Sequence, residues 1–396
     1  MSTTYYLNQP IINIGCLGSV SDGKSTMVHK LTGIKTQKHS NELKRNITIK
    51  QGYGNLKIYT NGDEYYTEEH TDTKLVNHIS FVDCPGHQEL IQTMLSSISL
   101  MDGAIVVIAV DQPLNKKPQL IQHLAAAKIG KLNKIIICMN KIDLVPKHIL
   151  MERKKELDEM LEEYCIKPYA IIPTCFNKNI GLNLLIKLIM ELFNPQEFID
   201  RTMSRSIFRI SRSFDINKPG TDWNNVLGGV IGGSLISGKL SVGDKIEIKP
   251  GQISKKDGKI ICQTIVTEIK SIKTDTSELQ QIVPGGLIAI GTDLDPYYSK
   301  NDGLIGNLVG LEGTLPNVYT KITLNFNIIT LFGFTWVPKN NDILILQIGT
   351  RTVESKLINA NTFELSKPVC IEKDEHIIIC KNIDKILRIV GEGNLI

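Results

Sequence analysis

The first half of the chain alternates between short apolar runs and longer segments with helical periodicity. Strands buried in a parallel sheet are nearly continuous apolar runs, whereas covering helices repeat their apolar positions every three or four residues. Strands are expected at residues 11–16, 78–82, 104–110, 134–139 and 170–173. Helices are expected at residues 24–32, 151–164 and 182–193. This alternation predicts an α/β domain, a mostly parallel doubly wound sheet with helices on both faces.

After Arg201 the pattern changes to short β-rich segments separated by Gly and Pro turn signals. Such segments lie at residues 206–214, 245–249, 321–330, 342–349 and 376–380, with a break at 312–316. This spacing predicts two antiparallel β-barrels rather than further parallel sheet. The expected domains are residues 1–203, 204–311 and 312–396, and the polar residues 61–77 are expected to form an exposed insertion.

Composition excludes few functions. The chain has 396 residues, 42% hydrophobic and 22% charged, which suits a globular protein of two or three domains. It has no apolar run long enough to span a bilayer, and its first ten residues do not resemble a secretory signal. We therefore expect a cytoplasmic protein with no membrane partner. The net charge of +4 is compatible with an RNA partner but does not require one.

The eight cysteines are scattered and include no C-x-x-C pair. Most lie in apolar runs, as Cys138 does, so we expect mainly buried, reduced thiols.

The strongest local signal is GSVSDGKS at residues 18–25, between a predicted strand and a predicted helix. It fits G-x-x-x-x-G-K-[ST], whose glycines let backbone N–H groups and a helix N-terminus face phosphate oxygens. In this pattern Lys24 neutralises the β- and γ-phosphates, and Ser25 gives a hydroxyl group to Mg²⁺. A Gly-rich turn is the alternative, but the flanking strand and helix favour a phosphate site.

A base-recognition motif follows a later strand. Residues 140–143 (NKID) come directly after an apolar run, at the carboxyl end of a predicted parallel strand, where such sheets bind ligands. They resemble the N-K-x-D motif of GTPases, whose aspartate accepts two hydrogen bonds from guanine N1 and N2. Adenine has no such donor pair, so the resemblance implies GTP or GDP as the ligand.

Two segments resemble the switch regions of GTPases. Residues 83–86 (DCPG) follow a strand and resemble D-x-x-G, which implies that Asp83 holds Mg²⁺ through water and that the Gly86 N–H contacts the γ-phosphate. Thr48 lies in RNITI at residues 45–49 and resembles the threonine whose hydroxyl joins the Mg²⁺ shell only with GTP bound. Release of both loops after hydrolysis is the switch that this resemblance implies.

His87 follows Gly86 directly, and in translation GTPases the histidine at this place orients the attacking water. The alternative is a surface imidazole that caps the next helix. The position beside the D-x-x-G glycine favours the catalytic role, in which His87 positions water rather than acting as a strong base.

These motifs define the expected site. Thr174 and Cys175 stand where related GTPases have Ser-Ala at the guanine ring. The expected nucleotide contacts are Ser21, Asp22, Gly23, Lys24, Ser25, Thr26, Gly86, Asn140, Lys141, Asp143, Thr174, Cys175 and Phe176. The expected Mg²⁺ ligands are Ser25, Thr48 and Asp83.

Other segments narrow the resemblance. Residues 41–50 (NELKRNITIK) followed by Gly52 and Tyr53 resemble switch I of the gamma subunit of eukaryotic and archaeal translation initiation factor 2, whereas elongation factor Tu carries Arg-Gly-Ile-Thr there. Further matches lie in order at residues 80–87, 214–220, 228–234 and 284–287. Several of these lie outside the motifs common to all GTPases, so the resemblance to this family covers nearly the whole chain.

The resemblance implies a GTPase that binds methionyl initiator tRNA in the GTP state, delivers it to the small ribosomal subunit and releases it after hydrolysis. It also implies a heterotrimer, with an alpha subunit on the second domain and a beta subunit on the first. GTPase-activating and nucleotide-exchange factors are further implied partners, so the chain alone is expected to be slow. Tyr53 either stacks on the terminal adenosine of the tRNA or is a core tyrosine beside switch I.

Two departures from the family matter for the site. Many relatives carry a cysteine knuckle before the D-x-x-G motif, but residues 57–77 contain no cysteine, so no structural zinc is predicted. Ser21 and Asp22 replace the usual Asp-His or Ala-His, and an extra carboxylate beside phosphates weakens binding unless Asp22 points outward.

Three alternatives stay open. The chain could be a selenocysteine-type or Tu-type elongation factor that carries another aminoacyl-tRNA. It could be the regulatory GTPase subunit of a sulfate-activating enzyme, which shares the motifs and a barrel. It could also be a GTP-binding scaffold without turnover.

Overall fold

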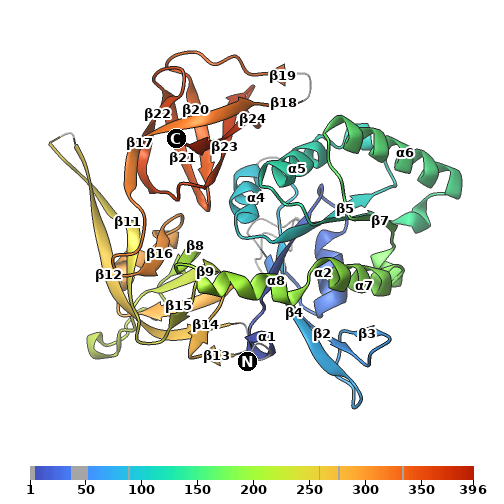
Figure 1. Cartoon of the computed structure of the whole chain (residues 1–396), viewed down its shortest axis with the longest axis horizontal. Coiled ribbons are helices and arrows are strands. Elements are labelled where there is room, and N and C mark those ends of the chain that lie inside the picture. The colour runs from blue at the N-terminus through green and yellow to red at the C-terminus, as the bar shows by residue number, and fades with distance from the viewer. Residues whose placement is uncertain (1–4, 37–51, 88–89, 258, 275–276, 332–333) are drawn as a thin grey trace. The chain divides into compact units, whose positions relative to one another are not determined.

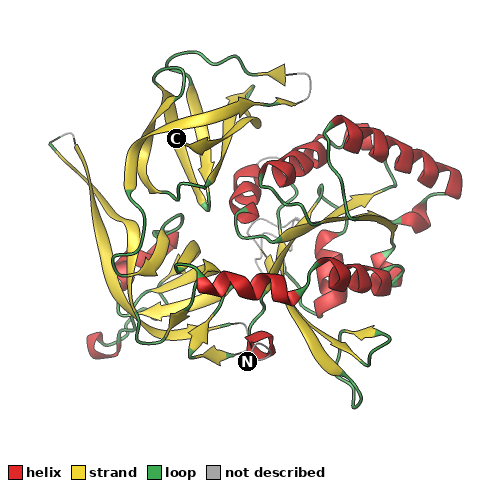
Figure 2. Ribbon diagram, viewed as in Figure 1, coloured by secondary structure: helices red, strands yellow, loops and turns green. Residues whose placement is uncertain are grey.

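The computed structural model describes residues 5–36, 52–87, 90–257, 259–274, 277–331 and 334–396. The chain divides into two compact units: Pro10–Glu197 forms one, and Phe198–Ile396 together with Met1–Gln9 forms the other. Most helices belong to the first unit, whereas strands dominate the second (Figure 2). Among the helices of the described residues, none is both long and apolar enough to cross a membrane.

The unit Pro10–Glu197 is built on a seven-stranded sheet with the order β3-β2-β4-β1-β5-β6-β7. Its strands are β1 (Ile12–Leu17), β2 (Gly52–Thr60), β3 (Tyr65–Tyr66), β4 (Lys74–Asp83), β5 (Gly103–Ala109), β6 (Ile135–Asn140) and β7 (Ala170–Pro173). Strands β4, β1, β5, β6 and β7 pair in parallel, and β2 and β3 are antiparallel additions. Every residue of β1, β5 and β6 is buried, which explains their nearly continuous apolar sequences.

Helices lie on both sides of this sheet, with α4 and α5 on one side and α2 and α7 on the other (Figure 1). The helices are α2 (Lys24–Thr32), α4 (Ile91–Ile98), α5 (Pro118–Ile129), α6 (Lys147–Glu163) and α7 (Leu182–Leu192), with short 3₁₀ turns η2 (Leu114–Lys116), η3 (Ile142–Leu144) and η4 (Phe176–Lys178). Helix α8 (Pro195–Ile199) begins in this unit and ends in the other. Helix α2 ends as expected at Gly33, whose left-handed φ of 72° lets its N–H donate to the carbonyl of His29. The predicted doubly wound α/β fold is confirmed.

Strand β2 was not predicted, and the expectation for residues 61–77 was incomplete. Those residues include β3 and the first part of β4. Along β2, buried residues alternate with half-buried or exposed ones, so its sequence has no continuous apolar run. Its antiparallel pairing with β4 extends from Gly52 opposite Asp83 to Thr60 opposite Lys74.

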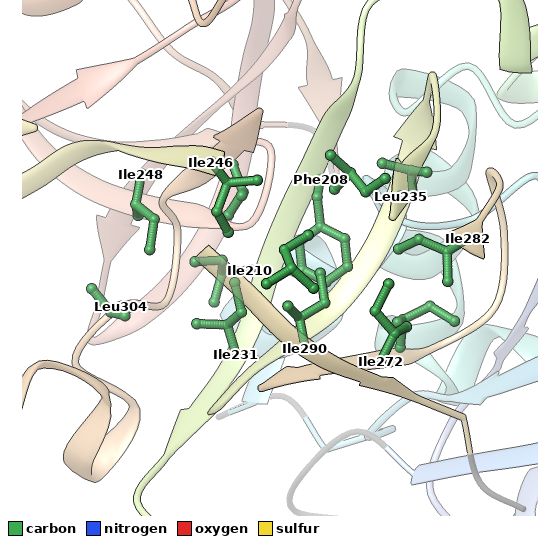
Figure 3. Close-up of a cluster of buried hydrophobic side chains, with 14 of the residues drawn as sticks. Phe208, Ile210, Ile231, Leu235, Ile246, Ile248, Ile272, Ile282, Ile290 and Leu304 are labelled. Atoms are coloured by element: carbon green, nitrogen blue, oxygen red, sulfur yellow. The ribbon is translucent and has the colours of Figure 1, made fainter. Parts of the chain in front are cut away.

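The first barrel of the second unit is a ring of six strands in the order β11-β16-β8-β9-β15-β12, closed by the pairing of β11 with β12. All of its pairs are antiparallel. Its strands are β8 (Ile207–Phe214), β9 (Val230–Ser237), β11 (Lys245–Lys256), β12 (Lys259–Lys273), β15 (Ile288–Thr292) and β16 (Leu308–Leu311), with smaller strands β10 (Leu240–Ser241), β13 (Glu278–Leu279) and β14 (Gln281–Ile282) at its edges. Buried side chains, among them Phe208, Ile210 and Ile290, fill its centre (Figure 3).

One turn signal in this barrel was misinterpreted. The sequence Lys249-Pro250-Gly251 was expected to end a strand, but β11 continues to Lys256. The register of β11 against β12 shifts between Ile248 and Gln252, so these residues form an irregularity inside the strand. Gly251 has a φ of 74°, which explains why a glycine stands at this place.

The second barrel is also closed and antiparallel, in the order β17-β22-β21-β20-β23-β24. Its strands are β17 (Val318–Ile328), β20 (Ile343–Ile348), β21 (Arg351–Leu357), β22 (Thr362–Cys370), β23 (His376–Ile383) and β24 (Ile386–Leu395), beside a small pair β18 (Thr330–Leu331) and β19 (Phe334–Thr335). Trp336 and Phe363 are fully buried in its core. The prediction of two barrels is therefore confirmed.

Short helical segments complete the second unit. They are α1 (Tyr5–Asn8), α9 (Pro296–Ser299), η5 (Asp200–Met203), η6 (Trp223–Asn225) and η7 (Lys300–Asp302). All eight cysteines are free, and most of them are buried, as expected.

Candidate nucleotide-binding site

The phosphate loop connects β1 to α2 and has an unusual backbone. Gly18, Ser21 and Gly23 have φ values of 136°, 64° and 107°. A Cβ atom on Gly18 would lie 2.1 Å from the carbonyl oxygen of Val107, and one on Gly23 would lie 2.3 Å from Asn140 Nδ2. Glycine is therefore required at both ends of the loop for steric as well as conformational reasons.

Lys24 is the first residue of α2 and is buried. Its Nζ donates to the carbonyl oxygens of Gly18 at 2.9 Å and Ser19 at 2.7 Å. Burial lowers the pKa of Lys24, while the nearby carboxylates of Asp83 and Asp22 act in the opposite direction. The loop thus holds an ammonium group at a helix N-terminus, an arrangement that favours bound phosphate.

Two hydroxyl groups meet the carboxylate at the end of β4. Ser25 Oγ donates to Asp83 Oδ2 at 2.7 Å, and Thr36 Oγ1 donates to the same oxygen at 2.5 Å. Oxygen ligands of this kind fit a partly hydrated Mg²⁺. Thr36 was missed because no sequence pattern marks it, and Thr48, the predicted threonine ligand, lies outside the described residues.

Gly86 lies directly against the phosphate loop. A Cβ atom placed on it would be 2.6 Å from Lys24 Nζ and 2.8 Å from the carbonyl oxygen of Gly18. His87 is exposed and lines a neighbouring hollow of about 290 Å³, together with Asp22 and Lys117. The predicted water-positioning histidine is therefore beside the phosphate loop.

Asn140, at the end of β6, joins two loops of the site. Its Nδ2 donates to the backbone carbonyl of Asp22 at 2.8 Å, and its Oδ1 accepts from the Phe176 N–H at 3.2 Å. Lys141 adopts a left-handed φ of 64°, and its Nζ pairs with Asp111 at 3.0 Å. These contacts tie the phosphate loop to the predicted base-recognition loop.

Asp143 accepts a hydrogen bond from Cys175 Sγ at 3.1 Å and pairs with Lys178 Nζ at 3.1 Å. The hydrogen bond from Cys175, followed by that from Lys178, lowers the pKa of the Asp143 carboxyl group. Burial raises the pKa of the Cys175 thiol, and the hydrogen bond to Asp143 raises it further, so the thiol stays protonated and donates. Asp143 is therefore an ionised acceptor at the mouth of the site.

A single pocket of about 590 Å³ brings the predicted residues together. All of the predicted nucleotide contacts except Asp22 and Thr174 line it, and so do His29, Lys35 and Thr36, which were not predicted. Thr174 is buried beneath the pocket, where its N–H donates to the carbonyl of Met139 at 2.8 Å. The contribution of each lining residue to binding stays a prediction.

Asp22 does not line this pocket; it lines the neighbouring hollow beside His87, where its buried carboxylate faces Lys117. Its carboxylate pairs with Lys117 Nζ at 2.5 Å and accepts the N–H of Ser19 at 2.8 Å. A second unpredicted contact reaches the loop from α5, where His123 Nδ1 accepts the Gly18 N–H at 2.9 Å. Both contacts join residues about a hundred positions apart, and no local pattern announces them.

Tyr53 lies on β2, half-buried and opposite Val82 in the pairing with β4. This position is compatible with either role expected for it.

Within the described residues, no group of three or more His, Cys, Asp or Glu side chains is arranged to hold a metal ion.

Family models match three parts of the chain. The model described as elongation factor Tu GTP binding domain matches residues 9–195, and that of elongation factor Tu domain 2 matches residues 228–298. The model described as initiation factor eIF2 gamma, C terminal, matches residues 336–395.

Relatives match the chain from end to end. The eukaryotic translation initiation factor 2 subunit gamma of Encephalitozoon cuniculi is 37% identical, over 98% of this chain and 93% of the relative. The translation initiation factor 2 subunit gamma of Methanococcus vannielii is 37% identical over 98% of both chains, and that of Pyrococcus furiosus is 37% identical over 97% of both.

Solved structures share the fold at lower identity. A bacterial selenocysteine-specific elongation factor, EF-Sec, superimposes with a TM-score of 0.76 at 19% identity, covering 98% of this chain and 58% of that one. Elongation factor SelB of Methanococcus maripaludis, in complex with the GTP analogue GppNHp, gives 0.74 at 19% identity, covering 98% and 79%. Similarity at this level supports the architecture alone.

Proposed function

Because the chain belongs to the family of translation initiation factor 2 gamma subunits, which are translation GTPases, we propose that it carries methionyl initiator tRNA in its GTP-bound state. It delivers the tRNA to the small ribosomal subunit and releases it after GTP hydrolysis. The nucleotide part of this proposal rests on the pocket that Lys24 and Asp143 both line, and the tRNA part rests on the kinship with initiation factor 2 gamma subunits. The pocket offers a cation for phosphate groups at Lys24 and an acceptor for guanine N–H groups at Asp143.

At the phosphate end, Lys24 and the N-terminus of α2 neutralise the phosphate oxygens. Ser25, Asp83 and Thr48 would hold Mg²⁺, which would supply positive charge to those oxygens. Thr36 keeps the Asp83 carboxylate in place through its hydrogen bond of 2.5 Å.

At the base end, Asp143 accepts the two N–H groups of guanine. Asn140 holds the loops together, while Cys175 and Phe176 line the pocket beside the base. The thiol of Cys175 already donates to Asp143, so it orients the carboxylate that recognises guanine.

His87 orients the attacking water, and the chain hydrolyses GTP slowly without an activating protein. We expect His87→Ala to lower stimulated hydrolysis by at least about a hundredfold while GTP affinity stays within about threefold. Single-turnover hydrolysis and nucleotide titration measure the two quantities. His148→Ala, at an exposed histidine on α6, is the matched control. An unchanged stimulated rate in His87→Ala removes this residue from the mechanism.

The proposed partners are the alpha and beta subunits, the activating and exchange factors and the small ribosomal subunit, in the cytoplasm. The proposed domain limits are residues 1–203, 204–311 and 312–396. Tyr53 is the proposed neighbour of the terminal adenosine of the tRNA.

The experiment that tests the proposal compares tRNAs. Filter binding of the GTP-loaded chain to methionyl initiator tRNA and to an elongator aminoacyl-tRNA measures the preference directly. We expect initiator tRNA to bind at least about tenfold more tightly, a difference of about 1.4 kcal/mol. A preference for an elongator tRNA contradicts the proposal and favours an elongation-type carrier. Co-purification with an adenylyltransferase instead favours a sulfate-activating subunit.

A further inference from the structure

The phosphate loop contains a buried ion pair. Asp22 and Lys117 are only 1% and 7% exposed, and Lys117 Nζ lies 2.5 Å from Asp22 Oδ1. Ion pairs on protein surfaces contribute little, but removing one partner of a buried pair leaves an uncompensated charge. The charge of each of these two residues is therefore compensated by the other.

Backbone groups satisfy the remaining hydrogen-bonding capacity of the pair. Asp22 Oδ2 accepts the Ser19 N–H at 2.8 Å, and Oδ1 accepts the Ala109 N–H at 3.2 Å. Lys117 Nζ also donates to the carbonyl oxygen of Ala109 at 2.7 Å. The carboxylate thus ties the phosphate loop to the end of β5 and to the residue that precedes α5.

The pair lies next to the phosphate end of the pocket. Ser21 and Gly23, on either side of Asp22, line the pocket, and the backbone carbonyl of Asp22 accepts from Asn140. Asp22 is also close enough to Lys24 to act on its charge. If Lys117 did not compensate it, this carboxylate would repel phosphate oxygens and compete with them for the Lys24 ammonium.

We propose that Lys117 is a positioning residue for the phosphate loop: it neutralises Asp22 and holds that side chain away from the nucleotide. This inference rests on the proposed binding of guanine nucleotides. It explains how the loop accommodates an acidic residue beside its lysine. Because a triphosphate carries more negative charge than a diphosphate, an uncompensated carboxylate should weaken triphosphate binding more than diphosphate binding.

The test is a double-mutant cycle with Lys117→Met, Asp22→Asn and the combined variant, followed by equilibrium binding of GppNHp and GDP. Lys117→Met should weaken GppNHp at least about tenfold and weaken GDP less. In the combined variant no buried charge remains uncompensated, so GppNHp affinity should return to within about threefold of the parent chain. The selective loss with GppNHp separates an effect on phosphate charge from a general loss of structure.

Lys154→Met is the matched control, because Lys154 forms an exposed pair with Asp158 at 2.6 Å on α6. It should change neither affinity. If Lys117→Met does not fold, the combined variant decides: recovered folding and GppNHp binding support the proposal, and no recovery overturns it. Equal affinities in Lys117→Met and the parent chain also overturn it. Failure of the parent chain to bind guanine nucleotides instead contradicts the proposed function itself.

Discussion

Acidification should destabilise the unit Pro10–Glu197 through His123 on α5. The imidazole is buried, and its Nδ1 accepts the Gly18 N–H at 2.9 Å. Burial, followed by the charge of Lys24, lowers the pKa of His123 from 6.5 to about 3. An accepting nitrogen carries no proton, so protonation would remove this hydrogen bond and place a second positive charge near Lys24.

The size of the effect follows from this pKa. Between pH 6.5 and about 3, the unfolded chain holds a proton on His123 that the folded chain does not. The stability contributed by the neutral imidazole is complete above pH 6.5 and is lost as the pH falls. Each pH unit in this window costs about 1.4 kcal/mol of unfolding free energy, so the full effect is about 5 kcal/mol.

Urea unfolding at several pH values measures the slope, and far-UV circular dichroism follows this unit because it holds most of the helices. His123→Asn keeps an acceptor but does not titrate. Between pH 7 and 5 the parent chain should lose about 2 kcal/mol more than His123→Asn. The control His148→Asn, at an exposed histidine on α6, should behave like the parent chain. Equal pH slopes for the parent chain and His123→Asn would refute the reasoning.

Three substitutions test the pocket by nucleotide titration. Gly86→Ala should weaken GTP by about 1–3 kcal/mol, because its methyl group would lie 2.6 Å from Lys24 Nζ; unchanged affinity would contradict the close packing of Gly86 against the phosphate loop. Asp143→Asn should weaken GTP at least about tenfold, since a charged acceptor for guanine is lost, and equal affinity would exclude the assigned base contact. Lys24→Met should reduce nucleotide binding more than either change, and a smaller loss would contradict its assigned role.

The fold of the first unit could be predicted where burial leaves a simple pattern. Strands β1, β5 and β6 are buried throughout, so their apolar runs were visible in the sequence. Strand β2 was missed because only alternate positions along it are buried. The predicted end of β11 came too early because Pro250 and Gly251 resemble a turn. Local sequence does not distinguish a turn from an irregularity within a paired strand.

Some features of the site could likewise be predicted from the sequence, and others could not. Spacing pointed to Lys24, Asn140 and Asp143, which line one pocket, because a motif fixes its residue types within a few positions. Spacing could not give the direction of the Asp22 side chain, which depends on Lys117. That partner lies 95 positions away in the sequence, directly before α5, so only the folded chain brings the two side chains together.

The measurement that tests the account most directly compares two nucleotide states. Methionyl initiator tRNA is titrated against the chain loaded with GppNHp and against the chain loaded with GDP, under identical salt and Mg²⁺ conditions. We predict at least about tenfold tighter binding of the tRNA in the GppNHp state, a coupling free energy of about 1.4 kcal/mol. Equal affinity in the two states would contradict the claim that this pocket controls tRNA binding.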